Sequence, residues 1–273
     1  MILLKLGGSL ISDKKKKFSV RRGVLDRLAA EIKAGAKEKL IIVHGGGAFG
    51  HPVASEYELH RGFKDKAQTK GIVLTRIAMN EMNNRVIDAL ARRGIPAVSV
   101  QPSANVICRG GRIEQLNAEI IRKFLELDIT PVLYGDVVLD EKQGFCILSG
   151  DQIISYISKI FKPSRIILAT DVDGIFDKNP KKFRSAKLIE EINPANLEKI
   201  LQKLEASPRD VTGGIKGKLL ELVALARKGF EAQIINAIKP GRLKKALLGQ
   251  QIIGTTIKKG RYKWIQNDRC KKA

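Results

Sequence analysis

Short apolar runs alternate with amphipathic segments along most of the chain. Residues 2–6 (ILLKL) and 40–43 (LIIV) have the length and composition of buried strands. Between them, the segment 24–33 places its apolar side chains on one helical face, at positions 24, 25, 28 and 32. The start of the chain therefore predicts a strand, a helix and a second strand.

The same alternation continues to residue 257. Further strands are predicted at 97–100, 131–134, 166–169, 233–235 and 255–257. Further helices are predicted at 71–93, 117–127, 152–161, 194–204, 215–228 and 241–248. Two short apolar runs, 137–139 and 145–148, flank DEKQG and predict a hairpin.

Strands that alternate with helices indicate an α/β fold with helices on both faces of the sheet. We therefore expect a three-layer αβα sandwich around an open, mostly parallel central sheet. The 273 residues are expected to form one domain, because no internal repeat or Gly/Ser linker interrupts them. The only visible lobe boundary lies near Lys162-Pro163-Ser164.

Four glycine-rich stretches are expected at the carboxyl ends of strands, where ligands of such sheets bind. They are LKLGGSLI at 4–11, LIIVHGGGAFGHP at 40–52, SGDQ at 149–152 and DVTGGIKGK at 210–218. Turns that lead into helices expose backbone N–H groups, which bind phosphate readily. One glycine pair is compatible with an ordinary tight turn, but four together predict an anion site.

Three other nucleotide or metal motifs fit less well. Gly45, Gly47 and Gly50 satisfy the dinucleotide pattern G-x-G-x-x-G, but the polar residues before Asp65 do not form the second strand that this pattern requires. His51-Pro52 also replaces the usual close packing of helix on strand. The GK pair at 217–218 lacks the flanking residues of a P-loop, and DVDG at 171–174 places its glycine too early for a calcium loop.

Composition narrows the class of protein. The 50 Lys and Arg residues against 28 Asp and Glu give a net charge of +22. Few aromatic residues lie near the densest basic segments, so anionic small molecules are favoured as partners over nucleic acid. Cys108, Cys146 and Cys270 form no CxxC pair and are expected to be reduced thiols of a cytoplasmic protein. No signal peptide or membrane span is expected.

The order of the motifs resembles that of the amino acid kinase superfamily: LKLGGS, VHGGG, SGDQ, TDVDGIF and TGGIKGK. Within it, HGGGAFGHP, QPSA, YGDVVLD and TDVDGIFDKNP are similar to the archaeal isopentenyl phosphate kinases. The resemblance covers about residues 1–260. His51 is its most distinctive element, because acetylglutamate, aspartate and uridylate kinases lack it. Fosfomycin kinase is similar at this position.

The resemblance implies transfer of the ATP γ-phosphoryl group to isopentenyl phosphate, giving isopentenyl diphosphate and ADP in isoprenoid biosynthesis by the alternate mevalonate pathway. It also implies a substrate-binding lobe at 1–163, an ATP-binding lobe at 164–273, Mg²⁺ that arrives with ATP, and a homodimer. Two alternatives stay open: a fosfomycin-like or other small phosphomonoester or phosphonate as acceptor, and a basic protein that binds nucleic acid.

Residue roles follow from the same resemblance. The catalytic set comprises Lys5, Lys14, His51, Asp151 and Lys218. The acceptor phosphate is surrounded by Gly46, Gly47, His51 and Gly150. ATP contacts Lys5, Gly7, Gly8, Ser9, Gly47, Asp171, Asp173, Gly174, Gly214 and Lys218. No protein ligand is assigned to magnesium.

Several of these residues also have simpler interpretations. A lysine inside ILLKL favours a functional role for Lys5, but Asp151 is equally suited to cap the helix that follows it. Four lysines occupy 14–17, and Lys14 is the one that matches the motif. His44 ends an apolar strand and is expected to pack in the core, and His60 has no inferred role.

The proposed chemistry needs cations more than a base. A phosphate monoester has a second pKa of about 6, so the acceptor is already a nucleophilic dianion at neutral pH. The difficulty is to bring two anions together, for which lysines and backbone N–H groups are suited. An isopentenyl tail requires an apolar pocket, and its candidate walls, which serve equally well as core residues, are Ile72, Val73, Ile77, Val132 and Ile147.

Overall fold

The computed structural model describes the backbone of residues 1–13, 16–178, 180, 183–205 and 214–261, and their side chains except those of 203–205 and 214–218. Its centre is an eight-stranded sheet with the order β12-β14-β13-β9-β1-β2-β6-β3. In that order the strands span Glu191–Ile192, Gly254–Ile257, Ala232–Asn236, Arg165–Thr170, Ile2–Leu6, Leu40–His44, Thr130–Tyr134 and Ala97–Ser99. Neighbouring strands of this sheet run parallel except β13 and β14, as the mostly parallel prediction requires.

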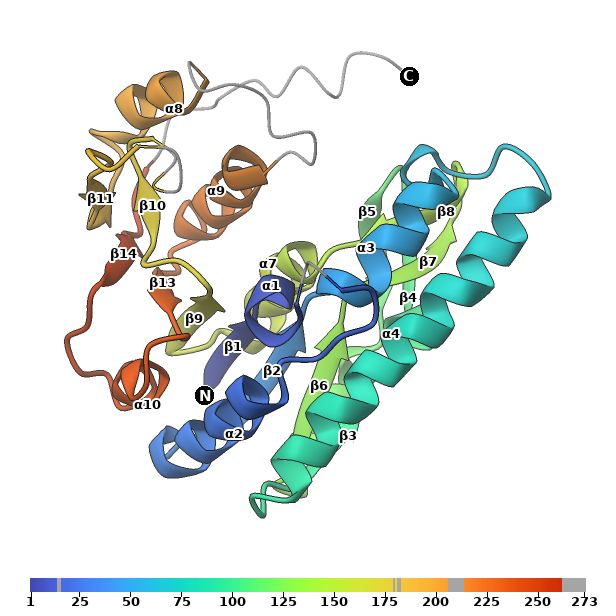
Figure 1. Ribbon diagram of the computed structural model, residues 1–273, viewed down its shortest axis with the longest axis horizontal. Helices are drawn as coiled ribbons and strands as arrows, with labels where there is room; N and C mark the ends of the chain where they lie inside the picture. The colour runs from blue at the N-terminus through green and yellow to red at the C-terminus, as the bar shows by residue number, and fades with distance from the viewer. Residues whose placement is uncertain (14–15, 179, 181–182, 206–213, 262–273) are drawn as a thin grey trace.

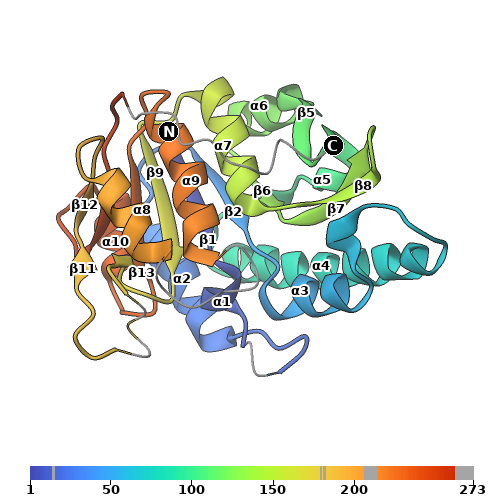
Figure 2. The same ribbon diagram turned by 90° about the horizontal axis from the view of Figure 1, so that it is seen from above.

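Helices cover both faces of the sheet (Figures 1 and 2). One face packs against α6 (Ala118–Glu126), α7 (Gly150–Phe161), α8 (Leu197–Glu205) and α9 (Gly214–Ala226). The other packs against α1 (Gly8–Ile11), α2 (Arg22–Gly35), α3 (Gly47–Glu56), α4 (Ala67–Ala91) and α10 (Arg242–Leu247). The predicted three-layer sandwich is confirmed.

The strand residues divide between two hydrophobic clusters, because successive side chains of a strand point to opposite faces. In β1, Leu3 belongs to the cluster under α7 and α9, whereas Leu4 and Leu6 belong to the cluster under α2 and α4. A strand buried on both faces reads as a continuous apolar run, which is why ILLKL and LIIV were informative.

A second sheet, of order β5-β4-β7-β8, lies beside α3 and α4 (Figure 1). The predicted hairpin forms β7 (Asp136–Asp140) and β8 (Gly144–Leu148). Sequence patterning did not predict β4 (Val106–Arg109), β5 (Arg112–Leu116) or the short α5 (Pro102–Asn105) before them. Strand β5 is partly exposed and polar, so it carries no apolar run. A small pair, β10 (Ile175–Phe176) with β11 (Leu188–Ile189), flanks the large sheet.

The segment after the second glycine turn differs from prediction. A helix was not expected across His51-Pro52, but α3 runs through both residues to Glu56 and is followed by a 3₁₀ turn, η1 (Leu59–Arg61). The long helix α4 begins four residues before the predicted start, because its first turn is polar and lacks the apolar period. None of the helices described is both long and apolar enough to cross a membrane. Cys108 and Cys146 are buried free thiols.

Candidate active site

The turns that follow the central strands are joined side by side along the carboxyl edge of the sheet. Their backbone N–H groups donate, at 2.8 to 3.0 Å, to carbonyls at the ends of neighbouring strands: Ala237 to Thr170, Gly7 to Ala169, Gly45 to Leu6 and Gly135 to His44. A Cβ on Gly135 would lie 3.8 Å from Gly150 N and 3.9 Å from Gly46 N. Three of the four predicted glycine corners therefore meet at one place.

The first two glycine turns touch each other through their main chains. A Cβ on Gly8 would lie 2.3 Å from Gly47 N, and one on Gly45 would lie 2.9 Å from Gly8 N. Gly47 also has a φ of +48°, a conformation that side chains disfavour. The turn after β1 and the turn after β2 thus approach each other too closely for side chains at Gly8 and Gly47. This contact is sufficient to require glycine at both positions.

Ser12 connects the two turns through hydrogen bonds. Its hydroxyl donates to Gly8 O at 2.7 Å and accepts from Ala48 N at 2.9 Å. Ser12 is completely buried, so both bonds are shielded from water. The turn after β1 is thus bonded to the first turn of α3.

Lys5 lies in β1 with only 6% of its surface exposed. Its Nζ is 2.5 Å from Asp151 Oδ2, in the first turn of α7. A buried lysine requires such a partner, because an unpaired ammonium loses its hydration. The helix itself is capped by Ser149, whose Oγ accepts from Gln152 N at 3.2 Å. The interpretation of Asp151 as the N-cap was wrong, and its carboxylate is directed to Lys5 instead.

Helix α3 begins at Gly47, with Gly46 as its N-cap. The amino end of a helix presents N–H groups and a partial positive charge, which favour a phosphate. A Cβ on Gly46 would lie 3.1 Å from Met79 Sδ, and one on Gly50 would lie 2.8 Å from the same atom. His51 follows Gly47 by one helical turn and is exposed.

The other two histidines are placed as expected from the sequence. His44 is fully buried and stacks on Tyr134 with ring centroids 5.3 Å apart. Burial lowers the pKa of His44 to about 4, so it is neutral at pH 7. Its Nε2 lies 3.2 Å from Asn83 Oδ1, which makes it a packing residue with a satisfied ring nitrogen. His60 lies exposed in η1.

Three of the residues assigned to ATP, Asp171, Asp173 and Gly174, lie in the loop after β9, and side chains of other elements hold this loop. Ser9 Oγ donates to Asp171 Oδ1 at 2.7 Å. Asp173 Oδ1 accepts from Asn236 Nδ2 at 3.3 Å and forms a short ion pair with Arg242, the first residue of α10. A Cβ on Gly174 would lie 2.3 Å from Thr255 Oγ1, so the loop packs closely on β14.

The structure describes the remaining assigned residues only in part. Lys14 lies outside the described residues, as do 210–213 of the fourth glycine stretch. Gly214 opens α9 and Lys218 follows by one turn, but only their backbone belongs to the described part.

Sequence reasoning missed Ser12, Asn236 and Arg242. Arg242 and Asn236 contact Asp173 across 69 and 63 residues of chain, so no local pattern connects them. Ser12 had a usable signal, since a serine one helical turn after Gly8 often bonds back to that carbonyl.

The candidate walls of an apolar acceptor pocket are dispersed. Val132 is fully buried in the core, and Val73 and Ile77 are 52% and 59% exposed on the outer side of α4. These three assignments are not supported. Ile72 packs against the cluster that contains Val137 and Phe145, and Ile147 is 36% exposed on β8.

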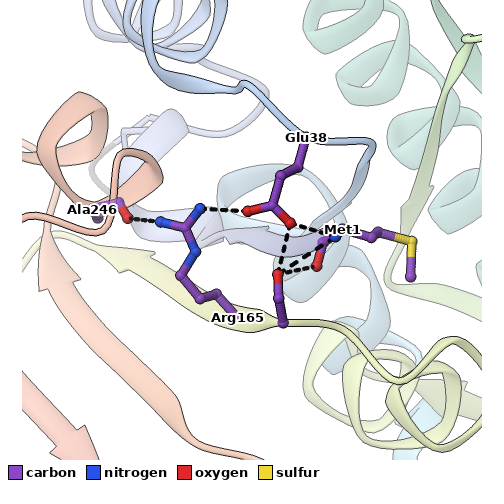
Figure 3. Close-up of polar contacts among 5 residues, drawn as sticks. Met1, Glu38, Arg165 and Ala246 are labelled. Carbon is purple, nitrogen blue, oxygen red and sulfur yellow. Dashed lines mark hydrogen bonds and ion pairs between the residues drawn. The ribbon is translucent and has the colours of Figure 1, made fainter.

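The opposite, amino edge of the sheet carries a different polar network (Figure 3). Glu38 accepts from the Met1 amino group at 2.5 Å, Ser164 Oγ at 2.8 Å and Arg165 Nη2 at 2.7 Å. These bonds, the amino group's most of all, lower the pKa of Glu38 to about 2. A cavity of about 390 Å³ opens at the same edge, between α2 and the loops before β3 and β6. It lies at the far end of the strands from the glycine turns and from Lys5, so it takes no part in the candidate site.

The residues at the carboxyl edge fit a phosphate chain. Bare main chain, the start of α3 and α7, and the buried Lys5 ammonium all offer donors or positive charge to an anion. Among the described residues, no group of three or more His, Cys, Asp or Glu side chains is arranged to hold a metal ion.

Comparisons with known proteins agree with this architecture. Residues 1–236 match the amino acid kinase family. An isopentenyl phosphate kinase of Methanothermobacter thermautotrophicus is 44% identical over 265 residues, which cover 94% of this chain and 98% of that protein. A crystal structure of an isopentenyl phosphate kinase is 41% identical with a TM-score of 0.83, covering 94% of this chain and 100% of the other.

A second solved structure, a product complex of the isopentenyl phosphate kinase of T. acidophilum, is 28% identical with a TM-score of 0.79, covering 94% of this chain and 100% of the other. Sequence and fold thus agree over nearly the whole length. The chain belongs to the amino acid kinase family, in the isopentenyl phosphate kinase group.

Proposed function

We propose that the protein transfers the γ-phosphoryl group of ATP to isopentenyl phosphate, forming isopentenyl diphosphate and ADP. The relatives named above support the reaction class and the acceptor. The observation that carries the proposal is the buried Lys5–Asp151 pair, at the corner where three glycine turns meet. A fixed cation surrounded by main-chain donors is what transfer between two anions requires.

In this reaction a terminal oxygen of the acceptor phosphate attacks the γ-phosphorus, and the bond from that phosphorus to the bridging oxygen of ADP breaks. The acceptor is largely a dianion at neutral pH, because its second pKa is about 6. The protein needs to remove no proton. Its task is to align the two phosphates and to stabilise the charge that spreads over the transferring group.

Lys5 supplies part of that charge. Asp151 fixes the direction of the ammonium, and burial strengthens its interaction with phosphate oxygens. We assign Lys218 and Lys14 to the same task on the basis of their motifs. Mg²⁺ bound to the ATP phosphates would supply further neutralisation.

The acceptor phosphate is assigned to the start of α3, with Gly46 and Gly47 as main-chain donors and His51 as a side-chain donor. Gly150, at the start of α7, completes this side. The nucleotide is assigned to the opposite side, against Gly7, Gly8, Ser9, Gly214 and the loop with Asp171, Asp173 and Gly174. The acceptor residues all lie in the proposed substrate lobe, 1–163. The nucleotide residues come from the proposed ATP lobe, 164–273, and from Gly7, Gly8 and Ser9 of the first lobe.

An apolar tail is assigned to the space between α4 and the β7–β8 hairpin. Ile72 and Ile147 are retained as its walls because both are partly accessible and near this hairpin. The homodimer stays a prediction.

The function is tested by a coupled assay of ADP release with isopentenyl phosphate, fosfomycin and a small panel of other phosphomonoesters. We expect isopentenyl phosphate to be turned over with the highest kcat/KM. Preferred turnover of fosfomycin would move the protein to the alternative acceptor class. Absence of ATP consumption with every acceptor would overturn the kinase assignment.

His51→Ala sharpens the test, with His60→Ala as its matched control. We expect His51→Ala to lower kcat/KM for isopentenyl phosphate by roughly 100-fold, the usual effect of losing one donor to a transition-state oxygen. ADP affinity, measured by calorimetry, should not change. His60→Ala should behave as wild type, since His60 is exposed in η1.

A further inference from the structure

Pro52 stands inside α3, five residues after the helix begins at Gly47. A proline has no backbone N–H, and its ring crowds the carbonyl four residues earlier. In α3 this carbonyl belongs to Ala48, which consequently lacks its usual partner within the helix. The Phe18 N–H donates to the Ala48 oxygen instead, at 3.2 Å.

Two side-chain contacts also join Lys17 and Phe18 to α3. The rings of Phe18 and Phe49 meet edge to face with centroids 5.8 Å apart. Lys17 Nζ lies 3.5 Å from Glu56 Oε2, at the last residue of the helix. Phe18 also has a φ of 56°, which is unusual for a residue with a side chain. Residues 17 and 18 are thus attached to α3 through the Phe18 main chain and through the side chains of both residues.

Ala48 is held from its other side as well. Its N–H donates to Ser12 Oγ at 2.9 Å, while its carbonyl accepts from Phe18. Ser12 is bridged to Val20, and Asp13 N donates to Ser19 O at 2.9 Å. Both ends of the lysine-rich stretch after Ser12 therefore attach to a single residue in the first turn of α3.

We propose that Pro52 is a positioning residue for phosphoryl transfer: by leaving the Ala48 carbonyl to Phe18, it fixes residues 16–18 against the first turn of α3. The inference rests on the proposed function, in which that turn binds the acceptor phosphate. Cations held beside this phosphate stabilise the charge of the transferring group. Lys16 is the cation of the described residues that this proposal invokes, since Lys17 pairs with Glu56 at the opposite end of α3.

The inference separates stability from activity. Proline is the least favourable residue in a helix interior, so Pro52→Ala should strengthen α3 itself. In that variant the N–H of residue 52 can bond to the Ala48 oxygen and competes with Phe18. The helix then gains a hydrogen bond and Phe18 loses one. We therefore expect stability to rise or stay unchanged while activity falls.

The experiment compares Pro52→Ala with wild type in thermal unfolding, ADP calorimetry, steady-state kinetics with isopentenyl phosphate, and hydrogen exchange of the Phe18 amide. We expect an unchanged or higher melting temperature and unchanged ADP affinity. We expect kcat to fall roughly tenfold, because small misplacements of positioned groups have effects of this size. The Phe18 amide should exchange faster.

Three variants serve as controls. Phe18→Gly keeps the N–H and tolerates the positive φ but removes the ring, so it should show a smaller fall in kcat. Pro194→Ala, at an exposed proline before α8, should leave kcat unchanged. In a His51→Ala background, Pro52→Ala should still lower kcat, which excludes an effect transmitted only through the neighbouring histidine.

Wild-type kcat in Pro52→Ala with a faster-exchanging Phe18 amide would overturn the inference. A lower melting temperature together with weaker ADP binding would also overturn it, since this outcome indicates a merely structural proline. If wild type itself does not phosphorylate isopentenyl phosphate, the proposed function fails. The Phe18 exchange rate then still reports whether Pro52 docks the segment.

Discussion

The glycine turns and the nucleotide loop lie along the same edge of the sheet, but they are held in different ways. Gly8 and Gly47 meet main chain to main chain, and the Ser12 hydroxyl bonds to the Gly8 oxygen and to the Ala48 N–H beside them. Asp171 and Asp173 are held by side chains, from Ser9 in α1, Asn236 in β13 and Arg242 in α10.

Helix α2 helps to hold the nucleotide loop indirectly, through contacts with α10 and with the turn after β13. Glu31 accepts from Gly241 N at 3.0 Å and from Lys244 N at 3.1 Å, which fixes the start of α10. Arg27, paired with Glu31, donates to Ala237 O at 2.7 Å. The glycine corner thus depends on the absence of side chains, whereas the loop depends on polar and charged side chains. The two regions should respond to different substitutions.

The largest expected effect comes from Gly8→Ala. Its Cβ would fall 2.3 Å from Gly47 N, and main chain cannot move away as a flexible side chain can. We expect loss of most activity and a decrease of about 3 kcal/mol in the free energy of unfolding, at the upper end for overpacking. Urea unfolding and the coupled assay measure both.

Gly23→Ala is the matched control, because nothing lies within 4 Å of a Cβ at that position in α2. It should stabilise the protein by up to about 1 kcal/mol through helix propensity. A Gly8→Ala variant as stable as wild type would show that the two turns do not need their contact.

An intermediate effect is expected from Arg242→Gln. Without the guanidinium, the Asp173 carboxylate loses its cationic partner beside the site proposed for the nucleotide phosphates. We expect ADP affinity to weaken roughly fivefold, a modest loss because both side chains are partly exposed. The isopentenyl phosphate KM should not change.

The double variant Arg242→Gln/Asp173→Asn should recover part of that affinity, because the uncompensated charge is gone. Arg85→Gln, which removes an exposed pair with Glu81 on α4, is the control and should bind ADP as wild type. Failure of the double variant to recover would show that Arg242 acts on the nucleotide directly.

The smallest effect is expected at Glu38, in a network of the same kind away from the site (Figure 3). Its folded pKa of about 2 lies below the usual 4.5, so its stabilising effect is present above pH 4.5 and is lost as pH falls toward 2. Because the side chain is 36% exposed, we expect Glu38→Gln to cost only about 1 kcal/mol at pH 7. The difference between variant and wild type should shrink toward pH 2, and urea titrations at several pH values measure it. ADP affinity should stay constant.

Much of the fold could be predicted because its signals are local. A strand buried on both faces is a continuous apolar run, and a helix repeats every 3.6 residues, so both are visible in short windows. Exposed or polar elements escaped prediction: β5 has no apolar run, and α3 continues past Pro52 because its first turn is held by Ser12 and Phe18.

The sequence by itself determined the alternation of strands and helices, the glycine corners and the buried position of Lys5 in an apolar strand. The tertiary structure decided that Gly8 meets Gly47, that Lys5 pairs with Asp151, and that Arg242 reaches Asp173. It also assigned the cap of α7 to Ser149 and separated Val73 and Val132 from any acceptor pocket. The physical reason is that these contacts join residues far apart in the chain. Their partners are chosen by how the strands are ordered in the sheet, which no local pattern records.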